Sequence, residues 1–528
     1  MKKKIIIFLV FFAMLFSGCV FSRPENEPQG QWWENAVFYE IFVRSFYDSD
    51  CDGIGDFNGI TQKLDYLQDL GVTALWLMPI HPSPSYHGYD VVDYYAVNQD
   101  YGTLEDFQNL VEESHNRGIR VIIDLVLNHT SVEHPWFVDA EANPDSPYRD
   151  WYIWSDHYPG YTGPFGAAWH ASDTGYYYGV FWSGMPDLNY TNPEVTAEME
   201  EVARFWLTEI HVDGFRVDAA KHLIEEGIKQ ENTDSTHQWF RQFYTFYKSE
   251  DPQAYVVGEV SGAGAILAKT YTGDQFDEVF NFDLANGLIK SANNRKKQAV
   301  NSALTLTLKR IDNGQYASFL TNHDQNRVMS VLGGDIDKAK VAASLLLTAP
   351  GTPYIYYGEE IGMQGEKPDE DIRLPMQWSS EANAGFSCPQ ARAWRPPHEN
   401  YPQVNVVAQL GQEDSLLSHY QQLIALRDEH PALRTGTTIL VNTDNAALFS
   451  SLRATSDEGI LVLINLANQV ILNPTISLDT STLAEKNYKL VSLLGDLDGS
   501  LIVNPKGGFQ LRIDYSIQPY ETLLLKLK

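Results

Sequence analysis

Cysteine and basic residues are both scarce in this chain of 528 residues. Only Cys19, Cys51 and Cys388 are present, too few for the disulfide framework that holds small secreted domains together. Whether Cys51 and Cys388 pair is left open. Lys and Arg total 38 against 69 Asp and Glu, a formal net charge of -31 at pH 7. This acid excess argues against nucleic acid as a partner and indicates a soluble, self-repelling surface.

The N-terminal apolar run is too short to span a membrane comfortably. It extends from Ile5 to Phe16, after Lys2–Lys4 and before Ser17-Gly18-Cys19, which predicts a secretory signal peptide over residues 1–18. The small residues before Cys19 resemble a bacterial lipoprotein cleavage box, although Phe16 stands where that box usually has Leu. We therefore expect an exported lipoprotein. Its lipid on Cys19 would be its only membrane contact, and 19–31 would form a linker; secretion without the lipid is the alternative.

From about residue 32, apolar strands alternate with amphipathic helices. Eight such strands predict an α/β fold, a closed parallel (β/α)8 TIM barrel, over residues 32–129 and 191–432. The expected strands are Val37–Val43, Ala74–Pro79, Arg120–Leu125, Gly214–Val217, Tyr255–Gly258, Glu278–Phe282, Ala317–Leu320 and Pro353–Tyr357. The expected helices include Gly59–Leu70, Thr103–Arg117, Pro193–Glu209, Asp337–Thr348 and Asp414–Arg427.

Two regions depart from this alternation. Between Leu127 and Asn192 the chain has many aromatic residues and no helical period, which predicts an inserted domain over 130–190 after the third strand, on the functional face of the barrel. From residue 433 to 528, short alternating strands separated by Asn, Asp and Gly turns predict a C-terminal antiparallel β-sandwich domain.

Arg216 and Asp218 lie two residues apart in a β-prone segment. Side chains at this spacing share one face of a strand, so a guanidinium is expected beside a carboxylate that it keeps ionised and oriented. A covalent glycosidase nucleophile must be such a carboxylate. The alternative is an ion pair that only stabilises a strand end.

Acids also follow other predicted strands. Glu259 ends one, Asp324 follows another, and Asp124, Asn128 and His129 close a third. Catalytic residues of a (β/α)8 barrel sit at the C-terminal ends of its strands. Acids at three or four strand ends, with His129 and His323 beside them, are hard to explain by packing.

Together these segments resemble the α-amylase family, glycoside hydrolase family 13. Its five conserved regions are matched in order by Asp124-Leu-Val-Leu-Asn128-His129, Met185-Pro-Asp-Leu-Asn189 (the fifth region, inside the insertion), Gly214–His222, Gly258-Glu259-Val260 and Phe319–Asp324. The resemblance extends from about residue 32 to the C-terminus.

The resemblance implies catalytic roles. Asp218 would attack the anomeric carbon, and Glu259, with a raised pKa, would act as acid and then as base. Asp324 would hold sugar hydroxyls and stabilise the oxocarbenium-like state. The family's substrate-binding positions correspond to Tyr89, His129, Arg216, Lys221, His222 and His323. Plain packing is the alternative for the tyrosine and the histidines.

The segment Asp48–Asp56 resembles the start of an EF-hand loop. Asp48, Asp50, Asp52 and Asp56 take positions 1, 3, 5 and 9, and the carbonyl of Ile54 takes position 7. Gly59 replaces the usual Glu at position 12, so we expect an EF-hand-like Ca²⁺ loop; the alternative is an acidic surface turn. The resemblance also implies a second Ca²⁺ shared by Asn128, the inserted domain and the backbone near His222.

Subfamily signals are mixed. Met185–Asn189, Asp48–Asp56 and Pro375-Met-Gln-Trp378 resemble the oligo-1,6-glucosidase and neopullulanase side, whereas Lys221-His222 and Tyr86-His-Gly-Tyr89 resemble true α-amylases. Exo-acting relatives carry Asp where Tyr86 stands. We therefore expect a monomeric, retaining, endo-acting α-1,4-glucan hydrolase of the intermediary α-amylase type that cleaves starch and maltooligosaccharides. The alternatives are an α-glucosidase or cyclomaltodextrinase, and a non-catalytic sugar-binding lipoprotein, which the three acids disfavour.

Overall fold

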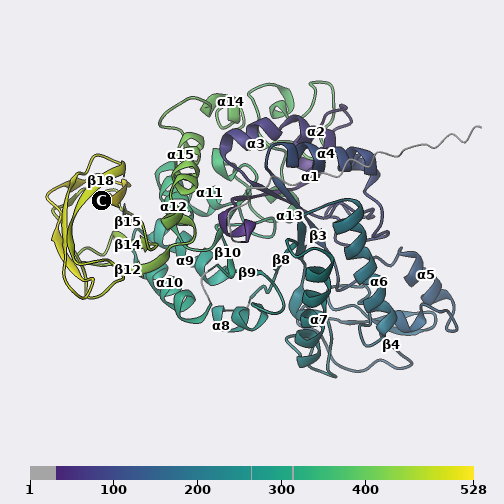
Figure 1. The fold of residues 1–528 in the computed structure, drawn as a ribbon. Helices are drawn as coiled ribbons and strands as arrows, with labels where there is room; N and C mark the ends of the chain where they lie inside the picture. The colour runs from purple at the N-terminus through teal and green to yellow at the C-terminus, as the bar shows by residue number, and fades with distance from the viewer. Residues whose placement is uncertain (1–30, 263, 312–313) are drawn as a thin grey trace, which may run out of the picture.

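The computed structural model describes residues 31–262, 264–311 and 314–528. The predicted signal peptide, Cys19 and nearly all of the linker lie outside these residues. No helix in the described ranges is long and apolar enough to cross a membrane. Eight parallel strands close into a barrel in the order β1-β11-β10-β9-β8-β7-β3-β2, which confirms the predicted TIM barrel (Figure 1). Its strands are β1 (Phe38–Ile41), β2 (Ala74–Leu77), β3 (Arg120–Leu125), β7 (Gly214–Val217), β8 (Tyr255–Gly258), β9 (Glu278–Phe280), β10 (Tyr316–Phe319) and β11 (Thr352–Tyr356).

The barrel strands are buried on both faces because helices cover the outside and side chains fill the inside. Phe38 on β1 stacks on Tyr354 of β11 with ring centroids 4.3 Å apart, within an aromatic layer inside the barrel. The surrounding helices are α1 (Val43–Phe46), α2 (Phe57–Gln62), α3 (Leu64–Leu70), α4 (Leu104–Asn116), α6 (Pro193–Arg204), α7 (Asp234–Glu250), α8 (Ala265–Ala268), α9 (Phe282–Asn294), α10 (Gln298–Arg310), α11 (Val328–Val331), α12 (Ile336–Thr348), α13 (Asp369–Ile372), α14 (Val406–Gln409), α15 (Leu416–Glu429) and α16 (Pro431–Arg434).

Two expected helices differ in detail from the structure. The helix expected over Gly59–Leu70 is divided into α2 and α3 at Lys63, whose ψ of 3° interrupts the helical backbone. The helix expected over Pro193–Glu209 is α6 followed by a π-helical turn, Phe205–Glu209. Burial periodicity is insensitive to both changes, because each keeps the same side chains facing the core.

The inserted region contains a three-stranded antiparallel sheet in the order β4 (Trp154–Ser155), β6 (Gly175–Tyr178), β5 (Trp169–Ser172). It also contains a helix, α5 (Pro135–Ala142), so the expectation of no helix here is wrong. Pro135 and the capping ring of His134, which accepts from the Trp136 N–H, start this helix. Only two of its eight residues, Phe137 and Ala140, are buried, which leaves no readable period.

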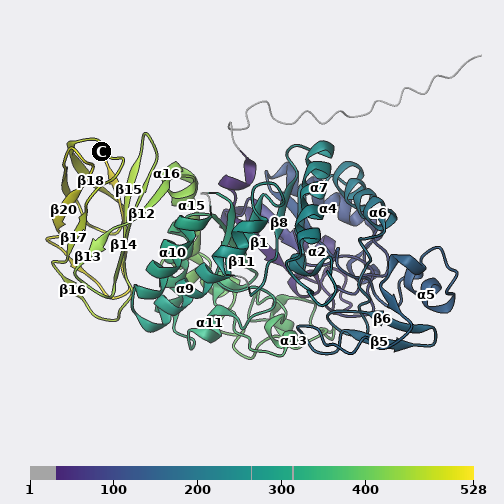
Figure 2. The ribbon, with the colours of Figure 1, turned by 90° about the horizontal axis from the view of Figure 1, so that it is seen from below.

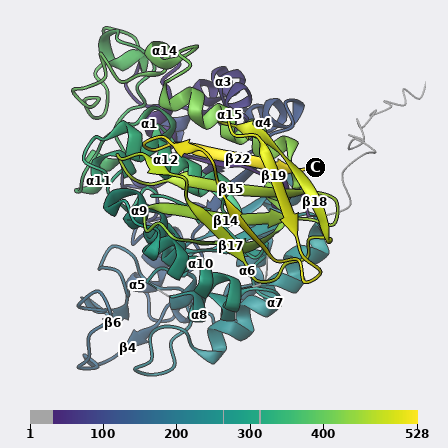
Figure 3. The same cartoon turned by 90° about the vertical axis from the view of Figure 1, so that its left-hand side faces the viewer.

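The C-terminal region forms antiparallel sheets of six, three and two strands around their own apolar core, as predicted (Figure 3). Figures 1 and 2 place these sheets and the inserted region at opposite ends of the molecule, with the barrel between them. The exact domain boundaries stay predictions. The strands are β12 (Thr437–Leu440), β13 (Asn442–Thr443), β14 (Leu448–Ala454), β15 (Gly459–Asn465), β16 (Ile471–Leu472), β17 (Thr475–Leu478), β18 (Lys486–Leu494), β19 (Gly499–Val503), β20 (Phe509–Arg512), β21 (Ser516–Ile517) and β22 (Thr522–Leu527).

Candidate active site

Arg216 is the fully buried centre of a carboxylate cluster at the C-terminal ends of the barrel strands. Its Nη1 donates to Asp124 Oδ1 at 2.8 Å and to Asp218 Oδ1 at 2.7 Å. Its Nη2 donates to Glu259 Oε2 at 2.7 Å. Strand pairing explains the arrangement, because Asp124 on β3 lies directly opposite Arg216 on β7, and β8 delivers Glu259 from the other side. The expected Arg216–Asp218 contact is present, and the same guanidinium also binds Glu259.

Asp218 and Glu259 are both largely buried, with side chains 14 % and 11 % exposed. Burial raises the pKa of Glu259, and the charges of Asp218 and Asp324 raise it further, against the opposing effect of Arg216. Burial also raises the pKa of Asp218, again opposed by Arg216. The guanidinium therefore limits the rise at Asp218 and does not reverse it. A raised pKa suits Glu259 to hold a proton as a general acid, while the Arg216 guanidinium favours the ionised form of Asp218 that a nucleophile requires.

The pKa of Asp324 is shifted in the opposite direction. Burial raises its pKa, but the charges of His323 and Arg373 outweigh burial, so its pKa is lowered overall. Arg373 Nη2 lies 3.0 Å from Asp324 Oδ1, and His323 Nε2 lies 3.4 Å from Oδ2. His323 Nδ1 in turn contacts Glu40 Oε1 on β1 at 2.5 Å. Sequence reasoning did not identify Arg373 and Glu40, although Arg373 lies two residues before the Pro375–Trp378 motif, because both meet the site only through barrel closure.

Tyr89 and His129 lie at the same site. The Tyr89 hydroxyl donates to Asp124 Oδ2 at 3.1 Å and lies 2.8 Å from His323 Nε2. His129 Nε2 lies 3.1 Å from the backbone carbonyl of Tyr89. Burial lowers the pKa of His129 to about 4, so this ring is neutral near pH 7 and supports the Tyr89 loop.

Lys221 and His222 are placed beside the cluster by a tight turn. Ala219 adopts φ 49°, a left-handed conformation, directly after Asp218. Lys221 Nζ pairs with Glu231 Oε2 at 2.8 Å, and His222 Nδ1 lies 3.1 Å from the Gln230 carbonyl. The rings of Phe165 and Phe181, which sequence reasoning also missed, pack 5.4 Å and 5.8 Å from His222.

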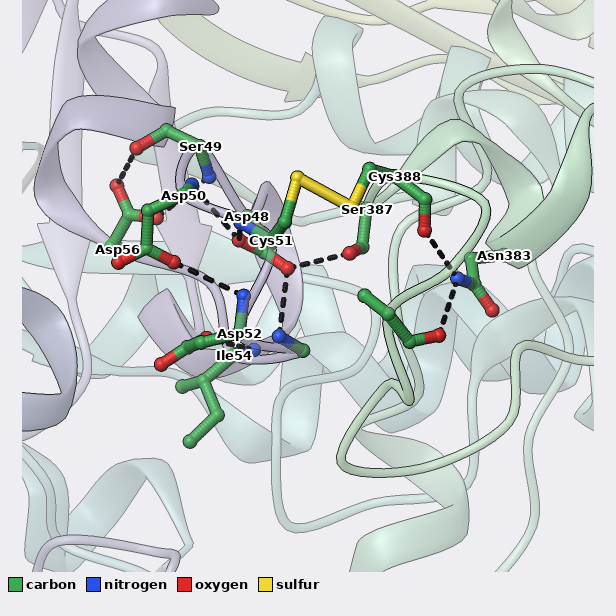
Figure 4. The surroundings of a disulfide bond; sticks show 12 residues. Asp48, Ser49, Asp50, Cys51, Asp52, Ile54, Asp56, Asn383, Ser387 and Cys388 are labelled. Atoms are coloured by element: carbon green, nitrogen blue, oxygen red, sulfur yellow. Dashed lines mark hydrogen bonds between the residues drawn. A yellow bond between two sulfur atoms is a disulfide. The ribbon is translucent and has the colours of Figure 1, made fainter.

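The acidic loop after α1 brings three carboxylates together (Figure 4). One carboxylate oxygen from each of Asp48, Asp50 and Asp56 lies within 4.8 Å of the other two. Carboxylate oxygens are the ligands that hard divalent cations prefer. Asp52 does not join this group, and its Oδ1 accepts from the Ile54 N–H at 2.7 Å. Cys51 and Cys388 form a disulfide, a pairing that the sequence left open. The hydroxyl of Ser387, next to Cys388, donates a hydrogen bond to Asp48 at 2.5 Å. The loop is thereby fixed to the segment after β11.

Asn128 belongs to a second set of buried oxygens. Asn128 Oδ1, Asp187 Oδ2 and Glu225 Oε1 are all shielded from solvent and have no hydrogen-bond partner among the described residues. Burial raises the pKa of Asp187 to about 7 and that of Glu225 well above its usual range, and the charge of Asp187 adds to the rise at Glu225. Unpaired buried oxygens of this kind fit a cation. Asp187, which hydrogen-bonds with Asn128, and Glu225, whose pKa the charge of Asp187 raises, are acidic neighbours that the sequence alone did not assign to this set.

Comparison with known proteins agrees with this geometry. The family model "Alpha amylase, catalytic domain" matches residues 40–436. Alpha-amylase 3 of Dictyoglomus thermophilum is 43% identical over 464 residues, 87% of this chain and 89% of that protein. Trehalose synthase/amylase TreS of Mycolicibacterium smegmatis is 36% identical over 80% of each chain. The crystal structure of an α-amylase from H. orenii superposes with a TM-score of 0.81 at 41% identity, over 93% of this chain and 99% of that one. The chain is a glycoside hydrolase of the α-amylase family.

Proposed function

We propose that the protein is a retaining, endo-acting α-1,4-glucan hydrolase of the intermediary α-amylase type, acting on starch and maltooligosaccharides. Asp218 is the nucleophile and Glu259 the acid and base. The observation that carries the proposal is that one guanidinium, on Arg216, holds both carboxylates at 2.7 Å while burial raises the pKa of Glu259. An acid next to a nucleophile is the arrangement that double displacement requires.

In the first step, Asp218 forms a bond to the anomeric carbon while the glycosidic C–O bond breaks. The Glu259 proton passes to the leaving oxygen. In the second step, Glu259 takes a proton from water, whose oxygen displaces Asp218, so the product keeps its configuration. Asp324, ionised because its pKa is lowered, accepts from sugar hydroxyls. Tyr89 supplies a ring beneath the same sugar, held by Asp124 and the His129 contact.

Endo action is supported by the residue at the position where exo-acting relatives carry an acid. Tyr86 stands there and stacks on Trp394 at a centroid distance of 5.5 Å, so an aromatic surface replaces a carboxylate that would bind a chain end. Arg373 lies 5.9 Å from the centre of the same ring. The competing proposal within the family is an α-glucosidase or cyclomaltodextrinase that acts on short oligosaccharides.

A product time course on starch, with the anomers resolved, tests polymer preference, endo action and retention together. We expect mixed maltooligosaccharides early, released as the α anomer, and slow turnover of maltose and isomaltose. Glucose as the sole early product would overturn endo action, and β-anomeric product would overturn retention. Trehalose formed from maltose would instead favour the chemistry named for the mycobacterial relative. Glu259→Gln should lose at least 10³-fold in kcat (an order-of-magnitude expectation for general acid catalysis) and keep its melting temperature.

We also propose that both oxygen-rich sets bind Ca²⁺, which would supply structural cross-linking. Asp48, Asp50 and Asp56 would hold one ion and Asn128, Asp187 and Glu225 the other. Export as a lipoprotein is a further proposal, since Cys19 lies outside the described residues. Labelling of the expressed protein with radioactive palmitate tests it, and equal labelling of a Cys19→Ala variant would overturn it.

A further inference from the structure

Glu40 and His323 form a buried pair that the proposed catalytic steps do not use. Glu40 lies on β1 two residues after Phe38, so its side chain points into the barrel as that ring does. The Glu40 side chain is 2 % exposed, and its Oε1 lies 2.5 Å from Nδ1 of His323, which is 1 % exposed. Among the described residues, no other basic side chain pairs with this carboxylate. A buried carboxylate is costly unless its partner is charged, so the pair indicates a cationic ring.

Both ring nitrogens of His323 face oxygen atoms that accept hydrogen bonds. Nδ1 faces the Glu40 carboxylate, and Nε2 lies 2.8 Å from the Tyr89 hydroxyl oxygen and 3.4 Å from Asp324 Oδ2. The Tyr89 hydroxyl has one proton, which it donates to Asp124 Oδ2 at 3.1 Å, so its oxygen is left to accept from the ring. Each ring nitrogen therefore has to donate, which only the doubly protonated imidazolium can do.

The electrostatics of the site agree with this hydrogen-bond pattern. Burial lowers the pKa of His323, but the charges of Asp324 and Glu40 outweigh both burial and the opposing charge of Arg373, so the pKa is raised overall. His129 is buried to the same extent at the same site, but no carboxylate pairs with it in the described structure. Burial lowers the pKa of that ring to about 4. The carboxylate partners, and not burial, therefore separate the two histidines.

Other residues that face the imidazole ring cannot take the place of Glu40. The charge of Arg373, in the segment after β11, opposes a positive ring. Asp124 contacts the ring only through the Tyr89 hydroxyl. Trp76 of β2 meets the ring edge-on at a centroid distance of 5.6 Å and carries no charge. The proton on Nδ1 therefore depends on the Glu40 carboxylate.

We propose that Glu40 is a positioning residue, which holds His323 as an imidazolium so that the ring fixes Asp324 and the Tyr89 hydroxyl beneath the sugar being cleaved. The catalytic part of this proposal rests on the proposed function. Without the Glu40 carboxylate, the ring loses its second proton at a lower pH. Nε2 then presents a lone pair to the oxygens of Asp324 and Tyr89, so both contacts become repulsive and the sugar loses its support.

Nuclear magnetic resonance of the full chain, with ¹⁵N in the histidine rings, reads the charge of His323 without any substrate. The signals that are missing from a His323→Gln variant identify this ring among the 14 histidines. We expect both of its nitrogens to carry a proton at pH 7. Glu40→Gln keeps an acceptor at Nδ1 and removes the charge, so the ring should lose its second proton about 1–3 pH units lower. Glu40→Asp, which keeps the charge, should recover at least half of that shift.

Hydrolysis kinetics give an independent readout. In Glu40→Gln, kcat on starch should fall roughly 10-fold or more with KM changed less than about threefold, because the lost contacts support the oxocarbenium-like state. The alkaline limb of the pH profile should move to lower pH, and Glu40→Asp should move it back. Glu278→Gln is the matched control, because Glu278 is also a fully buried barrel carboxylate but binds Tyr255 and Thr352 at the opposite ends of the strands. This control should leave the His323 titration and the pH profile unchanged.

The two readouts separate this proposal from the proposed function. A neutral His323 ring at pH 7 in the natural protein would overturn the role of Glu40 and leave the proposed function standing, and this measurement decides even if a variant does not fold. A ring that titrates alike in Glu40→Gln would overturn it equally. An equal loss of kcat at every pH, not recovered by Glu40→Asp, would assign Glu40 a structural role and refute the proposal. A natural protein that does not hydrolyse starch would overturn the proposed function, while the charge of the ring would still be measured.

Discussion

Replacing Arg216 by lysine tests whether one guanidinium organises the site. Arg216 uses Nη1 for Asp124 and Asp218 and Nη2 for Glu259, at 2.7–2.8 Å. An ammonium keeps the charge but is a single point and cannot span both sides. At least one charge-assisted hydrogen bond is lost, worth about 1.5–3 kcal/mol. Because about 1.4 kcal/mol corresponds to tenfold, we expect kcat/KM on starch to fall roughly 10- to 100-fold.

The pH profile of kcat/KM should change in a defined direction. Arg216 opposes the rise in pKa at both Asp218 and Glu259. Loss of its contact to Asp218 raises that pKa and moves the acidic limb to higher pH. Loss of its contact to Glu259 raises the pKa of the acid and moves the alkaline limb to higher pH. The same 1.5–3 kcal/mol corresponds to a shift of about 1–2 pH units in at least one limb.

Arg427→Lys is the matched control. Arg427 is also a fully buried arginine, but it donates to the backbone carbonyls of Leu347, Ala349, Gly351 and Leu433. This variant should lower the melting temperature and leave both limbs of the pH profile in place. A profile of Arg216→Lys that is unchanged, with kcat/KM within threefold of the natural enzyme, would refute the reasoning. A limb that moves to lower pH would refute it equally.

Three further predictions concern stability. Burial raises the pKa of Glu278 to about 8, so its neutral form stabilises the fold at low pH and that contribution is lost as pH rises from 4.5 through 8. Glu278→Gln should remove a drop of up to roughly 4 kcal/mol in unfolding free energy between pH 5 and 9, measured in urea; an equal drop in the variant contradicts this. Chelation should lower the melting temperature by several degrees, and less so in Asp187→Asn, whereas no change after verified metal removal excludes structural cations. Dithiothreitol should lower the melting temperature as Cys51→Ser with Cys388→Ser does, because the disulfide closes a loop of 337 residues and is worth about 2–4 kcal/mol; a reductant without effect removes that claim.

The barrel was readable from the sequence because its strands are buried on both faces and leave continuous apolar runs. All eight expected strands coincide with barrel strands to within a few residues. The helix α5 was missed because it buries only Phe137 and Ala140, and the break at Lys63 was missed because the apolar period continues through it. Local backbone changes that leave burial intact produce no signal in the pattern of residues.

The sequence by itself determined the strand ends, and therefore which acids, Asp218, Glu259 and Asp324, share one edge of the barrel. Short-range spacing was enough, because residues after parallel strands emerge on the same side. Only the tertiary structure decided the partners that come from distant segments: Arg373 and Glu40 at the active site, Asp187 and Glu225 beside Asn128, and the Cys51–Cys388 disulfide. It also decided the direction of the pKa shift at Asp218, because burial depends on closure of the whole barrel and not on the neighbouring arginine.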